Sequence, residues 1–66
     1  MQRISVAKSI QNYVIKLVYD NNDLIGAIIE GGRLPRPLYI AKSEKVKLNL
    51  PKPVKKFLIK NGFNIE

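Results

Sequence analysis

The side chains of this sequence that could do chemistry are mainly the lysines and arginines of its C-terminal half. Residues 33–60 contain nine cations and a single carboxylate, Glu44, which gives this stretch a net charge of +8. Clustered cations bind the phosphates of nucleic acids, with an affinity that depends little on base sequence and falls steeply with salt. The candidate nucleic-acid-binding residues are Arg33, Arg36, Tyr39, Lys42, Lys45, Lys47, Lys52, Lys55, Lys56 and Lys60.

The N-terminal half has a different charge pattern. Residues 1–32 carry three cations and three carboxylates, so almost all of the chain's net charge of +7 comes from the second half. Lysines are also the ordinary outer coat of small soluble domains. The C-terminal cluster nevertheless exceeds what solubility requires. Phosphate binding depends on folding that gathers these cations on one exposed surface.

Residues 33–39, with the sequence RLPRPLY, allow two interpretations. Arg33 and Arg36 stand on a rigid proline scaffold beside Tyr39, and such a segment could enter a nucleic-acid groove or stack on bases. Alternatively, the segment is a stiff connector whose prolines protect the edge of a sheet. The residue types alone leave both interpretations open.

No constellation of residues predicts catalysis. The chain contains neither histidine nor cysteine, which removes the usual general base and the thiolate ligands of metal sites. Asp20 and Asp23 flank two asparagines, and this pattern is typical of a turn that closes a hairpin. Gly31 and Gly32 lie outside any phosphate-loop motif. The sequence therefore predicts a protein that is not an enzyme, with no metal, no cofactor and no small-molecule substrate.

The N-terminal half reads as a β-hairpin. Residues 13–19 are rich in β-branched and aromatic side chains, and residues 24–29 are almost continuously apolar, with a four-residue turn between them. The segment before them, residues 1–12, fits either a short strand or a helical lead-in. The longest apolar run of the chain, residues 24–29, is far too short to cross a bilayer. We therefore expect a cytoplasmic protein, associated with the nucleoid if its partner is DNA.

The C-terminal half reads as short strands and one helix. Residues 38–40 are a candidate edge strand, because Pro35 and Pro37 precede them, and residues 45–50 alternate as a half-buried strand does. A helix beginning near Pro53 would bury Val54, Phe57 and Leu58. Gly62 would end this helix in the left-handed conformation, and Phe63 or Ile65 would fold back onto the core.

These elements define the expected fold class. It is α+β or mostly β, a small antiparallel sheet or barrel of four to five short strands with one C-terminal helix. We expect a single domain over residues 1–66, since a chain of this length supports only one hydrophobic core.

The second half also resembles a known family. Tyr39, the turn at residues 42–44, a strand at residues 46–50 that ends in Leu50-Pro51, and a helix containing Phe57-Leu58-Ile59 follow one another in this order, with Gly62 and Ile65 after them. This order resembles the small C-terminal β-rich B domain of archaeal GINS replication proteins. The resemblance implies a module of that shape that docks on replication or other nucleic-acid machinery.

Two functions follow from these patterns. The first is a binding protein that contacts DNA or RNA phosphates with low sequence specificity, as an accessory of replication or another information-processing system. The second is a protein–protein interaction module, an adaptor or inhibitor that docks on an acidic protein such as a component of the replication machinery. In that case residues 33–40 could add a strand to the partner's sheet.

Overall fold

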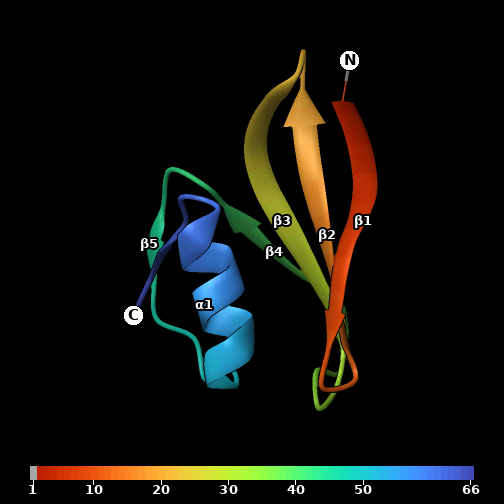
Figure 1. Ribbon diagram of the computed structural model, residues 1–66, viewed down its shortest axis with the longest axis vertical. Helices are drawn as coiled ribbons and strands as arrows, with labels where there is room; N and C mark the ends of the chain where they lie inside the picture. Colours follow the sequence, from red (N-terminus) through yellow and green to blue (C-terminus); the bar gives the residue numbers. More distant parts are fainter. Residues whose placement is uncertain (1) are drawn as a thin grey trace.

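The computed structural model describes residues 2–66 and is built mainly from β-strands (Figure 1). Four strands follow one another as neighbours in an antiparallel sheet: β1 (Gln2–Ile10), β2 (Tyr13–Asp20), β3 (Asp23–Gly31) and β4 (Leu38–Ala41). The second half holds the helix α1 (Lys52–Lys60) and a parallel pair of very short strands, β5 (Lys45–Val46) and β6 (Asn64–Ile65). The predicted fold class, mostly β with one C-terminal helix, is confirmed.

Tight turns join the first three strands. Gln11 and Asn12 have φ values of 47° and 70°, and Asn21 and Asn22 have φ values of 51° and 71°. Two-residue turns with both residues in the left-handed region match the twist of a hairpin, and asparagine tolerates this region better than most residues. The expected four-residue turn is therefore shorter, since Asp20 pairs with Asp23 at the end of the ladder. The segment before β2, for which the sequence allowed a strand or a helix, forms the strand β1.

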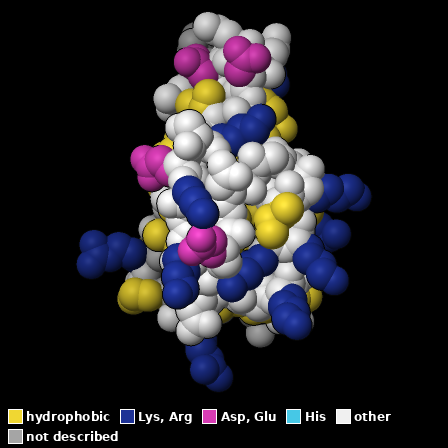
Figure 2. Space-filling view, turned by 90° about the vertical axis from the view of Figure 1, so that its left-hand side faces the viewer, with side chains coloured by type: hydrophobic (Ala, Val, Ile, Leu, Met, Phe, Trp, Pro, Cys, Tyr) yellow, Lys and Arg dark blue, Asp and Glu magenta, His cyan; other side chains and the backbone are white. Residues whose placement is uncertain are grey.

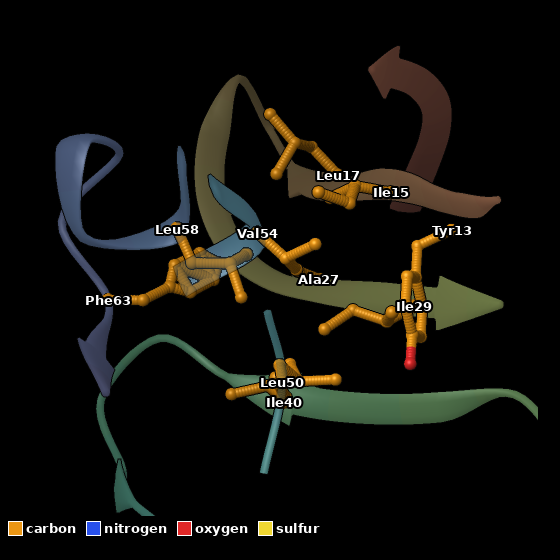
Figure 3. Close-up of a cluster of buried hydrophobic side chains, with 10 residues drawn as sticks. All are labelled: Tyr13, Ile15, Leu17, Ala27, Ile29, Ile40, Leu50, Val54, Leu58 and Phe63. Atoms are coloured by element: carbon orange, nitrogen blue, oxygen red, sulfur yellow. The ribbon is translucent and has the colours of Figure 1, made fainter. Parts of the chain in front are cut away.

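One face of the sheet is covered by α1 and the chain around it, and we call this the helix face. Side chains from β2, β3 and β4 meet side chains from the helix and its flanks in one buried cluster (Figure 3). Its members are Tyr13, Ile15, Leu17, Ala27, Ile29, Ile40, Leu50, Val54, Leu58 and Phe63. Alternate residues of a strand point to opposite faces of a sheet. An apolar residue at every second position of β2, β3 and β4 is therefore enough to build the sheet's part of this core.

The opposite face of the sheet, here called the open face, lies on the side away from α1 (Figure 1). Exposed apolar side chains remain there, since Ile4, Val6 and Tyr39 expose 55%, 68% and 53% of their surface. An ion pair also lies on this face, between Lys16 of β2 and Glu30 of β3, with 2.9 Å between the nitrogen and the oxygen. A single helix therefore covers only half of the sheet.

The strand predicted for residues 45–50 is only partly present, and this prediction needs correction. Lys45 and Val46 pair with Asn64 and Ile65, but residues 47–50 form no ladder. The predicted alternation nevertheless persists in their burial, because Leu50 is buried while Lys47 is exposed. A ladder extends only as far as a partner strand runs beside it, and β6 offers only two residues. The alternation at residues 45–50 thus predicted correctly which side chains are buried, but it wrongly predicted strand hydrogen bonds for residues 47–50.

The helix forms as its sequence predicts. Pro53 lies in the first turn of α1, where a missing N–H costs nothing. Val54 and Leu58 are fully buried, and Phe57 is partly buried against the same cluster. The spacing of these three residues points one side of α1 at the sheet and leaves the other side in solvent.

The end of α1 is closed by a Schellman motif. Gly62 has a φ of 96°, which favours glycine. The Gly62 N–H donates to the Ile59 carbonyl at 3.0 Å, and the Phe63 N–H donates to the Leu58 carbonyl at 3.1 Å. This pair of bonds turns the chain back, so that Phe63 packs in the core beside Leu58. The predicted glycine cap and the return of Phe63 are both confirmed.

The attachment of α1 to the sheet can be tested with two neighbouring residues. Leu58 is fully buried and Ile59 is 51% exposed. We expect Leu58→Ala to lower the free energy of unfolding by about 2–5 kcal/mol, because it leaves a cavity under the helix. Ile59→Ala should change it by about 0.5 kcal/mol or less. Urea unfolding followed by circular dichroism measures both, and similar losses in the two variants would contradict the orientation of α1.

Candidate nucleic-acid interface

The exposed side of α1 carries a row of lysines. Lys52, Lys56 and Lys60 are spaced by four residues and all three are exposed. Residues four apart lie on the same side of a helix, about one turn from each other. Because Val54 and Leu58 fix the opposite side in the core, the amines of this lysine row point away from the sheet.

Lys8 of β1 joins the lysine row from the side of the sheet. Its Nζ lies 5.6 Å from the centre of the Phe57 ring, a distance at which a cation is attracted to an aromatic face. Lys8, Phe57, Lys56 and Lys60 line one shallow depression beside the helix. The structure therefore brings a cation of the electrically balanced N-terminal half to the helix lysines.

A β-bulge in β1 accounts for the position of Lys8. Val6 pairs with Lys16, and Lys8 pairs with Ile15, so Ala7 is an extra residue. An extra residue reverses the alternation of side chains along a strand. Ile4 and Val6 consequently point to the open face, whereas Lys8 shares the helix face with Ile15. Sequence reasoning missed Lys8 because only the pairing with β2 reveals the bulge.

The remaining lysines near α1 lie on its other flank. Lys47 and Lys55 line a shared depression together with Asn49 and Glu66. Lys45 forms an ion pair with Glu66, with 3.0 Å between Nζ and Oε1. Among the predicted site residues of the described chain, Lys45 is the one that a carboxylate neutralises.

Arg33 lies at the end of the molecule where α1 begins. It lines a depression together with Asn12, Asn49 and Pro51, directly before the helix. The turn that holds it is fixed by a hydrogen bond from the Gly32 N–H to the Asn12 carbonyl at 2.9 Å. Arg33 can therefore extend the lysine row beyond Lys52.

Three predicted site residues do not join the others. Lys42 packs its side chain against Gly62 and lines a different depression with Leu24. Arg36 is exposed in the connection between β3 and β4 and does not line the depressions beside α1 that contain other cations. Tyr39 lies on the open face, where its ring covers Gly26. The position of Tyr39 places it across the sheet from the lysine row.

Figure 2 shows the charge distribution on the side of the molecule that bears β5. Lys and Arg side chains project around its lower part, which contains the helix, while acidic side chains lie at the upper end and also lower down, near these cations (Figure 2). The cations of the second half thus lie around the helix rather than on a single flat plane. The lysine row is the part of this set that the structure aligns, and Lys8 of the N-terminal half joins it.

Residues 2–66 contain no group of three or more histidine, cysteine, aspartate or glutamate side chains that could hold a metal ion. No helix among them has the length and apolar character needed to cross a membrane.

Comparisons with protein-family models, curated proteins and solved structures found no match for this chain. The resemblance to the GINS B domain therefore stays a prediction, and the function has to be inferred from the site itself.

The contact between Lys8 and Phe57 can be tested by NMR. A methylene group next to an aromatic face resonates upfield of its usual position, so the ε-methylene protons of Lys8 should be displaced upfield. Phe57→Leu keeps an apolar side chain in place and should return this signal to an ordinary lysine position. The ε-methylene signal of Lys52 serves as the control and should not change. An ordinary Lys8 signal in the unsubstituted protein would contradict the placement of Lys8 beside the helix.

Proposed function

We propose that this chain is a non-enzymatic nucleic-acid-binding protein whose lysine row and Lys8 contact the phosphate backbone. The observation that carries the proposal is the alignment of Lys52, Lys56 and Lys60 on the exposed side of one helix. Among the described residues, ion pairs join Glu30 to Lys16 and Glu66 to Lys45, and neither pair involves a lysine of the row. These amines are available to an external anion.

The rigidity of the helix supports this role. The buried side chains of Val54 and Leu58 hold α1 on the sheet, so the backbone under the lysines is ordered before any partner arrives. Each lysine that neutralises a phosphate releases condensed counterions, and this release gives most of the binding free energy at low salt. Lys47, Lys55 and Arg33 extend the basic surface along the strand of nucleic acid.

The residue types predict low sequence specificity. An ammonium group is a compact, strongly hydrated charge without the planar fork by which arginine recognises guanine. Phosphate contacts fix the position of a protein on a duplex but carry no direct sequence information. We therefore expect similar affinities for unrelated sequences, and both DNA and RNA as partners.

The salt dependence of binding tests this function. The slope of log Kobs against log salt is negative. We expect the triple variant Lys52→Gln, Lys56→Gln, Lys60→Gln to reduce its magnitude by about 2.7, because each lost phosphate contact removes about 0.9 on duplex DNA. Fluorescence anisotropy with a labelled duplex, measured over a range of NaCl concentrations, gives this slope. A matching single strand and an RNA hairpin extend the test to other nucleic acids.

A control of equal charge separates the lysine row from net charge. Arg3→Gln, Lys16→Gln, Lys45→Gln also removes three cations and likewise leaves a formal net charge of +4 from the original +7. Lys16 and Lys45 are already paired with carboxylates, so this variant should keep the original slope. Equal losses in both triple variants, or no binding of the unsubstituted chain at low ionic strength, would refute the proposed function.

A further inference from the structure

The outer edge of β1 is unusually accessible. β1 is nine residues long and pairs only with β2 among the strands of the described sheet. All of its residues are exposed except Ile10, which is partly exposed. The unpaired N–H and C=O groups along such an edge are a template for another strand. Nothing lies beside β1 on this side of the sheet in Figure 1.

The opposite edge of the sheet, formed by β4, is protected against pairing, whereas the β1 edge is not. β4 has only four residues, and Pro35 and Pro37 precede it in the chain. Short length and nearby prolines are devices by which proteins blunt an edge strand. β1 contains no proline, and its residues 2–6 form a regular run that ends before the bulge at Ala7.

The two faces of this edge differ in chemistry. Ile4 and Val6 expose 55% and 68% of their surface on the open face. Arg3 lies on the helix face, where its guanidinium is 5.7 Å from the centre of the Tyr19 ring, and Lys8 lies on the same face beside Phe57. A strand that is added to β1 therefore meets apolar side chains on one face and cations on the other.

We propose that β1 binds an extended acidic segment of a partner protein by adding it to the sheet as a fifth strand. Main-chain hydrogen bonds supply affinity in this mode of recognition, and alternate side chains supply specificity. Apolar side chains of the segment contact Ile4 and Val6, and its carboxylates face Arg3 and Lys8.

The register of the sheet gives the spacing of the recognised residues. Arg3 pairs with Tyr19 and Lys8 pairs with Ile15, so the two cations are separated by four residues of a regular strand. This separation corresponds to about 13 Å. The segment should carry acidic residues at its first and fifth positions and apolar residues at its second and fourth. The pattern is the same in either direction, so it fits a parallel or an antiparallel strand.

The positive charge of β1 and of the whole chain favours an acidic partner over a second copy of this chain. β1 carries two cations and no carboxylate, and the whole chain has a net charge of +7. Pairing of two β1 edges would bring these cations together, and like charges on neighbouring strands are destabilising. An acidic segment neutralises them instead. The proposal shares Lys8 with the proposed phosphate contacts, but it rests on the edge of β1 and does not depend on the lysines of α1.

An NMR titration with a synthetic peptide tests this proposal. The peptide is acetyl-Thr-Thr-Glu-Val-Thr-Val-Glu-Thr-Thr-amide, titrated into the ¹⁵N-labelled full chain at low ionic strength, where exposed charge pairs are least screened. We expect saturable shifts of the amides of residues 2–6 and slower hydrogen exchange along β1. A peptide with glutamine in place of both glutamates should bind more weakly. One with proline at the central position should not bind, since proline interrupts a strand.

Variants of the protein make the test specific. Arg3→Gln and Ile4→Thr should each weaken peptide binding about two- to fivefold. Lys56→Gln removes the same charge as Arg3→Gln and should leave peptide binding unchanged, while it weakens duplex DNA binding. Arg3→Gln should have no effect on duplex binding, so failure of one proposal is distinguishable from failure of the other.

Four results would overturn the proposal. The peptide could shift amides of α1 in place of β1, which would indicate unspecific charge attraction, or the glutamine peptide could bind equally well. The β1 amides could shift with protein concentration alone, which would show that a second copy covers the edge. Absence of any saturable shift would exclude strand addition by this peptide pattern.

Discussion

The packing of one short helix against one face of a four-stranded sheet is the interaction on which the rest of the structure depends. Val54 and Leu58 of α1 are fully buried, and they meet Ile15 and Ile29 of the sheet, which are fully buried too. A chain of about 60 residues buries only about 60% of the surface that it exposes when unfolded. Once α1 has covered the helix face, the described chain has no second helix to cover the other face. The open face and the free edge of β1 follow from this shortage.

The same packing determines where the charges lie. Because two buried residues fix the orientation of α1, Lys52, Lys56 and Lys60 point into solvent along one line. The Schellman motif after Lys60 ends the helix and returns the chain through Phe63 to the core, so the lysine row has a defined length. The bulge at Ala7 adds Lys8 to this row and turns Ile4 and Val6 to the other face. Because of this one extra residue, Lys8 lies on the helix face near the lysine row, whereas Ile4 and Val6 lie on the open face.

Local patterns predicted the helix and the strands β2, β3 and β4. Strand pairing decided that the segment before β2 is a strand and that the strand at residues 45–50 has only two residues. The spacing of Val54, Phe57 and Leu58 identified the buried side of the helix, and Gly62 identified its end, because both depend on residues close in sequence. The bulge that positions Lys8 depends on the register between β1 and β2. The side of the sheet that holds Tyr39 depends on its pairing with Ile28. The alternation at residues 45–50 predicted burial correctly, but the hydrogen bonds of a strand require a partner, which β6 supplies for two residues only.

The sequence predicted that residues 33–60 are rich in cations, but it did not predict which of these cations share one surface. The excess of cations in residues 33–60 is visible in the sequence, and folding selects from them Lys52, Lys56 and Lys60 while it separates Arg36, Lys42 and Tyr39. The most direct measurement of the central claim is an NMR titration of the full chain with a short DNA duplex at increasing salt. The account predicts shifts centred on α1 and Lys8, with smaller ones at Lys47 and Arg33, all of which disappear as salt is raised. Shifts centred on the open face around Tyr39, or shifts that persist at high salt, would contradict it.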